Sequence, residues 1–224
     1  LFIVAIFLLL FSPIVLSSSL YSCNTTCNSE HGKILTALKF GVLSTLGEFI
    51  GLRIRAGGYN VRSFGILPRA LVWAVLVMWI NMSFKIFGAG APLFADYIGI
   101  TGTAAAMAGS FTLLKLVGAL FISTSLNITF APVFMTLHKV TDTHIVNNGG
   151  TLRGFFRPIP FANILQNLNW NVQWNFVFKK TIPFFWIPAH TVTFLLPADL
   201  QILVAALLGV ALGIILAVAS GKGK

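Results

Sequence analysis

Ionisable side chains inside apolar segments are the residues of this sequence best suited to do chemistry. Glu48 and Lys115 lie within apolar runs, and His190 lies in a proline-rich run near the C-terminus. A charge buried in lipid costs several kcal/mol unless it is paired or hydrated, so such residues mark functional sites or ion pairs. Glu48 could pair with an arginine that follows it or line a pore, and the sequence leaves both alternatives open. No acidic partner is visible for Lys115.

The proline-rich run, "KKTIPFFWIPAHTVTFLLPADLQ", predicts an interrupted helix. Its prolines cannot donate backbone hydrogen bonds, and in lipid the carbonyls thus freed need other partners. Thr191, Thr193 and His190 could supply those hydrogen bonds. A broken segment lined by hydroxyls and an imidazole suits a solute path or a helix junction. The alternative is a kinked span whose prolines only shape the packing.

Metal-ligating residue types form two small groups. His138, Asp142 and His144 offer two imidazoles and a carboxylate, which could bind a metal ion, although no fourth ligand is evident. His138 and Asp142 are also spaced as an ordinary i,i+4 helix pair. Cys23 and Cys27 could close a local disulfide in an oxidising compartment, and two unpaired thiols are the alternative.

The composition places the chain in the integral membrane class. Of its 224 residues, 57% are hydrophobic and 9% are charged, whereas a soluble domain carries about a quarter charged residues. The net charge of +10 fits lysines and arginines gathered in loops on the inner side of a membrane, and we expect no nucleic-acid binding. Motifs of known enzymes are missing from the sequence, so we expect neither catalysis nor a cofactor.

The apolar runs predict an all-α, polytopic membrane protein with about five to six membrane segments, the one before the last being broken. We expect residues 1–33 to form an N-terminal membrane helix with a Cys-containing loop, and residues 34–220 to form a helical membrane domain. The predicted segments are 1–20, 34–52, 70–87, 98–138 (as one long helix, or as a re-entrant piece followed by a span), 183–196 (spanning or re-entrant) and 200–220.

Polar segments between these runs predict the orientation. Residues 88–96, "GAGAPLFAD", read as a turn, and the Trp- and Phe-rich part of residues 150–180 reads as an interfacial helix. With the N-terminus inside and each segment crossing once, most lysines and arginines of the loops lie on the inner side. The positive-inside rule therefore predicts that both termini face that side.

Part of the sequence resembles the Mpv-seventeen family of peroxisomal and mitochondrial inner-membrane proteins. The similar residues lie in "NWNVQWNFVFKKTIPFFWIPAHTVTFLLPADLQIL" and, upstream, in "LTALKFGVLSTLGEFIGLRIRAGG". The positions that match the C-terminal family signature, partly with changed side chains, are Trp186, Pro188, His190, Thr193, Phe194, Pro197 and Gln201. The resemblance covers roughly residues 34–220 and implies a helical membrane protein of about four spans, often described as a weakly selective channel for small solutes.

These observations give three functional hypotheses. The first is a channel for small solutes in a lipid membrane, lined by Glu48, Lys115, His190, Thr191 and Thr193. The second is a non-catalytic accessory subunit of a membrane complex, as a homo-oligomer or with other membrane subunits, in contact through residues 98–110 and 155–178. The third and weakest is a metal-dependent membrane enzyme that uses the His138 group.

Overall fold

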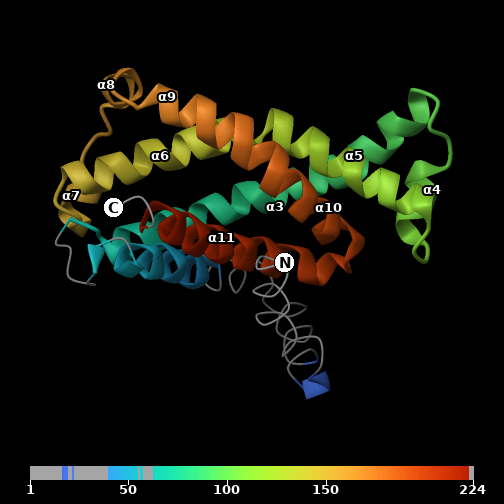
Figure 1. Cartoon of the computed structure of the whole chain (residues 1–224), viewed down its shortest axis with the longest axis horizontal. Helices are drawn as coiled ribbons and strands as arrows, with labels where there is room; N and C mark the ends of the chain where they lie inside the picture. The colour runs from blue at the N-terminus through green and yellow to red at the C-terminus, as the bar shows by residue number, and fades with distance from the viewer. Residues whose placement is uncertain (1–16, 20–21, 23–39, 55, 58–62, 222–224) are drawn as a thin grey trace. The chain divides into compact units, whose positions relative to one another are not determined.

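The computed structural model describes residues 17–19, 22, 40–54, 56, 57 and 63–221, and its elements are helical throughout. The all-α prediction is therefore confirmed for the described residues. A first long helix covers residues 40–54. The elements after it are α3 (Ile66–Tyr97), α4 (Thr103–Ala108), α5 (Leu113–Thr129), α6 (Ala131–Asn147), α7 (Leu152–Phe155), α8 (Phe161–Gln166), α9 (Trp170–Val172), the π-helix η1 (Gln173–Trp186), α10 (Ile187–Leu195) and α11 (Ala198–Gly221) (Figure 1). The predicted helix over residues 1–20, except for residues 17–19, and the cysteines Cys23 and Cys27 lie outside the described residues.

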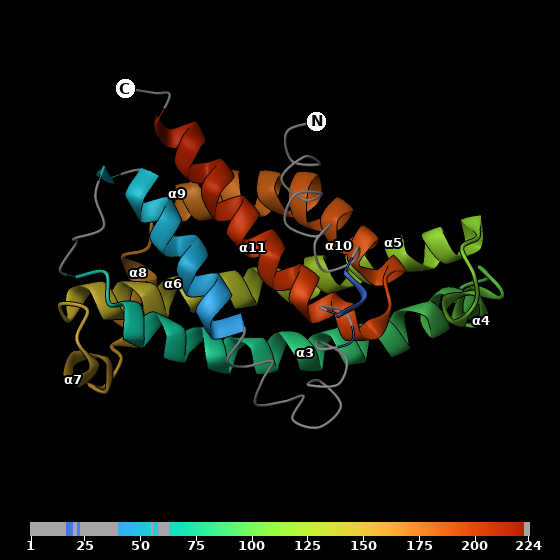
Figure 2. The same ribbon diagram turned by 90° about the horizontal axis from the view of Figure 1, so that it is seen from below.

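The chain divides into two compact units, and the first combines residues from three parts of the sequence. It contains the residues up to Met78, then Ile145–Arg157, and then Ile202 to the C-terminus. Its helices approach one another at glycines. A Cβ atom on Gly47 would stand 2.8 Å from the Cα atom of Val210 in α11, and one on Gly41 would stand 3.0 Å from the carbonyl oxygen of Ala70 in α3. Small residues of this kind let membrane helices pack backbone against backbone. Figure 2 shows the 40–54 helix alongside α11.

The start of α3 is fixed by two glycines in the first unit. Gly65 and Gly150 have φ angles of +68° and +69°, a region that side-chain-bearing residues rarely adopt. A Cβ atom on Gly150 would lie 2.7 Å from the backbone nitrogen of Gly65, so the two backbones touch. The amide of Arg69 donates to the Gly65 carbonyl over 3.0 Å and continues the first turn of the helix. This contact places Arg69 beside the 40–54 helix.

Helix α3 is longer than the sequence predicted. It runs from Ile66 to Tyr97 and includes Pro92, so the turn expected over residues 88–96 is wrong. The missing amide of Pro92 and its ring, which crowds the carbonyl four residues earlier, oppose the helix. The helix is held because Ala91 and Ala95 are buried in the second unit. Burial therefore overrides the local preference for a turn.

The second unit contains Trp79–His144 and Pro158–Gln201. Within it, residues 98–138, predicted as one long helix or as a re-entrant piece followed by a span, contain a short helix, α4, and a longer one, α5, which meets α6 at a bend of 46°. Gly118 allows α4 to pack against α5, because a Cβ atom there would come within 2.9 Å of the Thr103 side chain. Part of the Gly- and Ala-rich segment over residues 98–110 thus packs inside its own chain.

The broken helix near the C-terminus is present. Residues Gln173–Trp186 wind as a π-helix with Pro183 inside, and the backbone returns to α-geometry in α10, whose first turn contains Pro188. The helix ends at Leu195, before the extended backbone of Leu196. Prolines and π-turns are the usual causes of such interruptions, and π-turns occur often at functional sites.

One described helix, α3, is long and apolar enough to cross a membrane, and the bent pair α5–α6 passes the same test when taken as one span. The last predicted segment is a helix, α11, over almost the predicted residues. About five to six crossings and the orientation of the termini stay predictions. In the most apolar part of α3, 33% of the residues are buried, whereas the core helix of a soluble protein is mostly buried.

Candidate functional site

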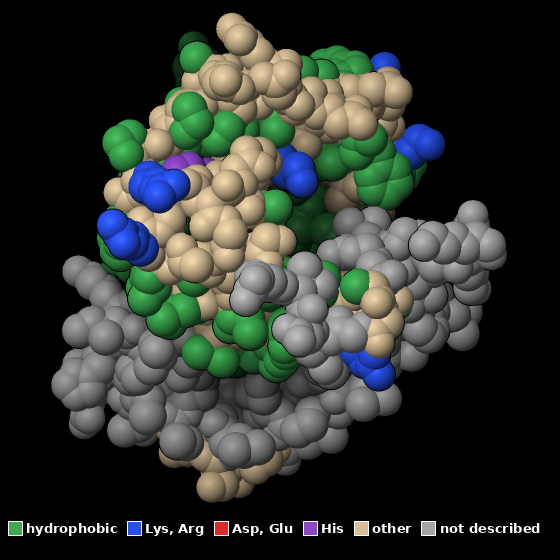
Figure 3. Space-filling model, turned by 90° about the vertical axis from the view of Figure 1, so that its left-hand side faces the viewer, with side chains coloured by type: hydrophobic (Ala, Val, Ile, Leu, Met, Phe, Trp, Pro, Cys, Tyr) green, Lys and Arg blue, Asp and Glu red, His purple; other side chains and the backbone are tan. Residues whose placement is uncertain are grey.

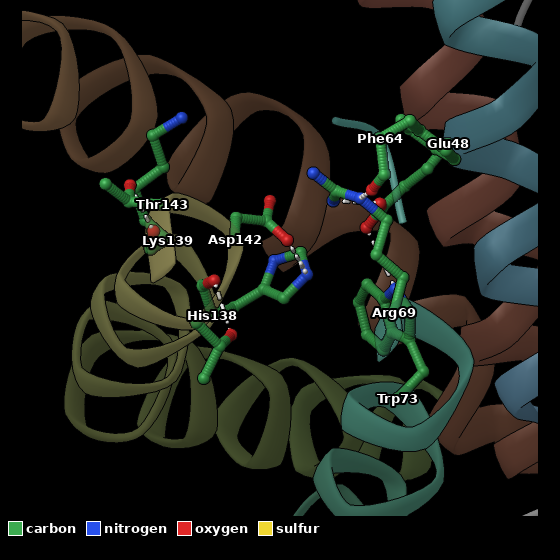
Figure 4. Close-up of polar contacts among 9 residues, drawn as sticks. Glu48, Phe64, Arg69, Trp73, His138, Lys139, Asp142 and Thr143 are labelled. Atoms are coloured by element: carbon green, nitrogen blue, oxygen red, sulfur yellow. Dashed lines mark hydrogen bonds and ion pairs between the residues drawn. The ribbon is translucent and has the colours of Figure 1, made fainter. Parts of the chain in front are cut away.

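Glu48 belongs to an ion pair inside the first unit. Its carboxylate accepts a short hydrogen bond from Nη1 of Arg69 and a second, of 2.9 Å, from Nε1 of Trp73. The Arg69 Nε atom donates to the Phe64 carbonyl over 2.8 Å, and the guanidinium lies 4.6 Å from the centre of the Phe64 ring. Figure 4 shows these side chains converging. Of the two alternatives from the sequence, the geometry supports the ion pair with an arginine.

His138 and Asp142 form the predicted i,i+4 pair on α6 in the second unit. The His138 Nε2 atom lies 3.6 Å from an Asp142 carboxylate oxygen, and both side chains are about one-fifth exposed (Figure 4). His144 is buried, with 1% of its surface exposed. On a continuous α-helix, residues two apart point in roughly opposite directions, so His144 faces away from Asp142. The three predicted ligands therefore do not converge as one metal site.

Lys115 lies in the first turn of α5 rather than in the middle of a span. Its Nζ atom donates to the carbonyl of Gly109 over 2.6 Å, and the bond is exposed. A backbone oxygen in the loop before the helix thus serves as the partner that the sequence did not show. Because the ammonium group is at the end of the helix, it needs no burial within the bilayer.

A line of buried, uncharged polar side chains joins α5 to α10 in the second unit. Asn127 donates from Nδ2 to the Ser123 carbonyl over 2.8 Å, and the same nitrogen lies 3.1 Å from Nδ1 of His190. The Ser123 hydroxyl donates to the carbonyl of Ile187 over 2.7 Å. Ser123 and Asn127 are almost completely buried, and His190 is 9% exposed. We call Ser123, Asn127 and His190 the polar cluster.

The contacts of Asn127 decide the protonation state of His190. An amide nitrogen has only hydrogens to offer, and one of those on Asn127 is used by the Ser123 carbonyl, which can only accept. The atom that faces His190 is therefore a donor, and the Nδ1 atom of His190 accepts. A ring that accepts at Nδ1 is neutral and holds its proton on Nε2. The polar cluster thus carries no net charge.

Aromatic rings surround the imidazole. The Trp186 ring centre lies 5.0 Å from that of His190, and the Phe84 ring meets it edge-on at 5.5 Å. Phe194 contacts the Phe84 ring at 4.9 Å and completes the wall. The Nε1 atom of Trp186 is buried and has no hydrogen-bond partner among the described residues. A buried donor in this condition costs about 1–3 kcal/mol, so one beside a polar cluster calls for an explanation.

The predicted threonines bond to their own helix. The Thr191 hydroxyl donates to the carbonyl of Ile187 over 2.7 Å, and the Thr193 hydroxyl donates to that of Ala189 over 3.0 Å. Hydrogen bonds of this kind, to the carbonyl four residues earlier, bend a helix. Pro188 has no amide and so leaves the carbonyl of Phe184 without its helical donor, but neither threonine bonds to that carbonyl. The structure therefore brings His190 into a site, while both threonines act within α10.

The other motif positions serve the helix junction. Pro197 precedes α11 and its carbonyl accepts from the Leu200 amide over 3.0 Å, while Nε2 of Gln201 donates to the Leu196 carbonyl over 3.1 Å. Ser123 had no assigned role in the sequence. Its signal was the i,i+4 spacing to Asn127 inside an apolar run, which places both polar side chains on one helix face.

The chain matches no model of a known protein family, no characterised protein and no solved structure. The Mpv-seventeen resemblance thus stays a prediction from the sequence.

Proposed function

We propose that this chain is an integral membrane protein that lets small, uncharged polar solutes cross a bilayer, and that solutes contact it at Trp186 and the polar cluster. The observation that carries the proposal is the buried, unpartnered Nε1 atom of Trp186 beside the neutral His190 ring. A polar solute with an acceptor oxygen would satisfy this donor. The absence of charge in the cluster favours neutral solutes over ions, which would need compensating charge in a low-dielectric site.

Two features of the described helices support membrane residence. The most apolar part of α3 leaves two-thirds of its residues unburied, and its exposed side chains include Leu71, Val75, Met78, Met82 and Ile86. These residues recur every three or four positions and form one apolar stripe. Such a stripe would be costly in water but not against acyl chains.

The interrupted helix supports a solute contact at this place. Irregular backbone at membrane depth is tolerated where protein buries it or where it lines a polar path. Here η1 passes into α10 at Trp186, one residue before the Ile187 carbonyl that accepts from Ser123. The backbone break, the orphaned indole donor and the polar cluster therefore fall within a short stretch of the second unit.

The test is solute flux into liposomes that contain the purified chain. We expect glycerol to enter faster than into protein-free liposomes, and Trp186→Phe to slow entry by roughly two- to tenfold, the value of one hydrogen bond. The substitution removes the N–H but keeps an aromatic ring, so it should leave the free energy of unfolding unchanged or raise it. Trp170→Phe is the matched control, because the Trp170 N–H is exposed and bonds to the Leu165 carbonyl. Solute-tight liposomes, or equal flux in the Trp186 variant, would refute the proposal.

The accessory-subunit alternative has one observation in its favour. Phe156, Trp170, Val172, Trp174 and Phe176 expose between 42% and 75% of their surface, which a partner chain could cover. It predicts that other membrane proteins copurify with the chain in mild detergent, and a monodisperse monomer would count against it.

A further inference from the structure

The segment from Phe161 to Lys180 exposes nearly all of its side chains. Among the residues of this segment, only Ile164 and Gln173 are buried. Two rows of residues recur along it at intervals of four, and all of them are exposed except Phe178, which is half-buried. We call them together the Asn–Trp face; its members are Asn163, Asn167, Asn171 and Asn175 in one row, and Trp170, Trp174 and Phe178 in the other.

The aromatic row is held in a fixed arrangement. Trp174 and Phe178 meet edge-on with ring centres 6.0 Å apart. Trp170 donates from Nε1 to the carbonyl of Leu165 over 2.9 Å, although 43% of its surface is exposed. The rings are thus ordered by neighbours within the segment while their faces stay accessible. Such rings, apolar in body and polar at one edge, are typical of the boundary between acyl chains and headgroups.

The asparagine row is bonded along the segment. Asn167 donates from Nδ2 to the Asn163 side chain over 2.9 Å, and Asn175 donates to the side chain of Asn171. Each pair keeps further amide donors and acceptors, because a single bond does not exhaust an Asn side chain. These amides can bind the glycerol, ester and phosphate oxygens of lipid headgroups. The asparagine row therefore suits the headgroup layer, and the aromatic row suits the boundary between headgroups and acyl chains.

Charge identifies the headgroup. Lys179 places its Nζ atom 5.7 Å from the centre of the Trp174 ring, and Lys180 beside it is also exposed. The sequence contains no acidic residue between Asp142 and Asp199. On the face of the molecule drawn in Figure 3, the coloured charged side chains are Lys or Arg, and none is acidic. Nothing in this stretch of sequence would repel an anionic phosphate.

From these contacts we infer that the Asn–Trp face binds the headgroup layer of a bilayer and that Lys179 and Lys180 select anionic phospholipids there. A protein partner fits less well, because interfaces between proteins are depleted in lysine, whereas the Lys179 ammonium lies against the exposed ring of Trp174 within this face. The inference rests on the membrane residence proposed above but not on solute transport.

The experiment measures quenching of tryptophan fluorescence by brominated lipids in reconstituted protein. The difference between the unmodified chain and Trp170→Phe/Trp174→Phe isolates the emission of the two exposed tryptophans. We expect dibrominated phosphatidylglycerol to quench it better than dibrominated phosphatidylcholine. In Lys179→Ala/Lys180→Ala this preference should fall by about fivefold per lysine at low salt, the usual effect of a basic residue near an anionic surface. Lys139→Ala, which removes an exposed lysine on α6, should leave the preference unchanged.

A tryptophan placed on the apolar stripe of α3, by Val75→Trp in the Trp170→Phe/Trp174→Phe background, separates the causes of failure. If the tryptophan introduced on α3 is quenched but Trp170 and Trp174 are not, the Asn–Trp face is covered by water or protein and the inference is overturned, while membrane residence stands. If neither the introduced tryptophan nor the native pair is quenched, both proposals fail. Equal quenching by the two lipids, unaffected by the lysine substitutions, would overturn the choice of anionic phospholipids.

Discussion

The two units of the molecule differ in the charge of their hydrogen-bonded buried polar groups, although each also buries polar atoms without a partner among the described residues: the hydroxyls of Ser44 and Thr45 in the first unit and the indole N–H of Trp186 in the second. In the first unit, Glu48 and Arg69 are charged, and each satisfies the other, with Trp73 and the Phe64 carbonyl completing the contacts. In the second unit, Ser123, Asn127 and His190 are uncharged, and a buried donor, Nε1 of Trp186, stands beside them without a partner among the described residues.

The difference shows where function is to be sought. A charged residue in an apolar helix is conspicuous in a sequence, but once it is paired its charge is neutralised within the fold. An uncharged cluster attracts less attention, although the buried N–H of Trp186 beside it has no partner among the described residues and is the donor that we propose a solute binds. We therefore assign stability to the ion pair of the first unit and solute contact to the polar cluster of the second.

The largest expected effect concerns the ion pair. Glu48→Leu should lower the free energy of unfolding by about 3–5 kcal/mol, because it removes the carboxylate that neutralises the buried Arg69 guanidinium. Glu48→Leu/Arg69→Met should regain most of this loss, since the remaining charge is removed as well. Unfolding of the detergent-solubilised protein by denaturant, followed by circular dichroism, measures both.

Lys115→Met is the control for this prediction. Its ammonium makes an exposed bond to Gly109, so its removal should change the free energy of unfolding by no more than about 0.5 kcal/mol.

Glycerol flux should be normal in the stable double variant of Glu48 and Arg69. If that variant folds but no longer conducts, Glu48 lines the path after all and the contrast between the units fails.

A smaller effect is expected in the polar cluster. Asn127→Ala removes the donor to Nδ1 of His190, which should cost about 1–3 kcal/mol of unfolding free energy. Asn127→Leu/His190→Phe removes both polar partners and should be close to the unmodified chain in stability, because apolar groups of similar shape replace a satisfied pair. We expect this double variant to fold and to have lost flux. Normal stability together with normal flux would show that the cluster only holds α5 against α10.

The sequence was sufficient for the helical class and for the interruption near the C-terminus. Both follow from local properties: apolar length predicts helices in a membrane chain, and three prolines within the segment disfavour a straight one. It was wrong where distant packing overrides local preference. The helix through Pro92 exists because Ala91 and Ala95 are buried. For residues 98–138 the sequence left one long helix and a short piece before a span as alternatives, and the structure has a separate α4 that packs on α5 where Thr103 approaches Gly118.

The candidate site was harder to predict than the fold. His190 was found because an imidazole in an apolar run is rare, but Ser123 is 64 residues from its acceptor, Ile187. No local pattern predicts which carbonyl such a hydroxyl will reach. The orphaned donor of Trp186 is also a property of the packed structure, because only burial turns an ordinary indole into an unsatisfied one.

The smallest loss of stability expected in the second unit's polar side chains separates the threonines from the polar cluster. Thr193→Val is nearly isosteric and removes only the hydroxyl bond to Ala189, a carbonyl that also lies within reach of the backbone ladder of α10. The loss of unfolding free energy should be about 0.5–1 kcal/mol, and Thr191→Val should behave alike. Glycerol flux in both variants should equal that of the unmodified chain, since their hydroxyls are engaged with their own helix. A loss of flux without a loss of stability would place these hydroxyls on the solute path and widen the site beyond Trp186, Asn127 and His190.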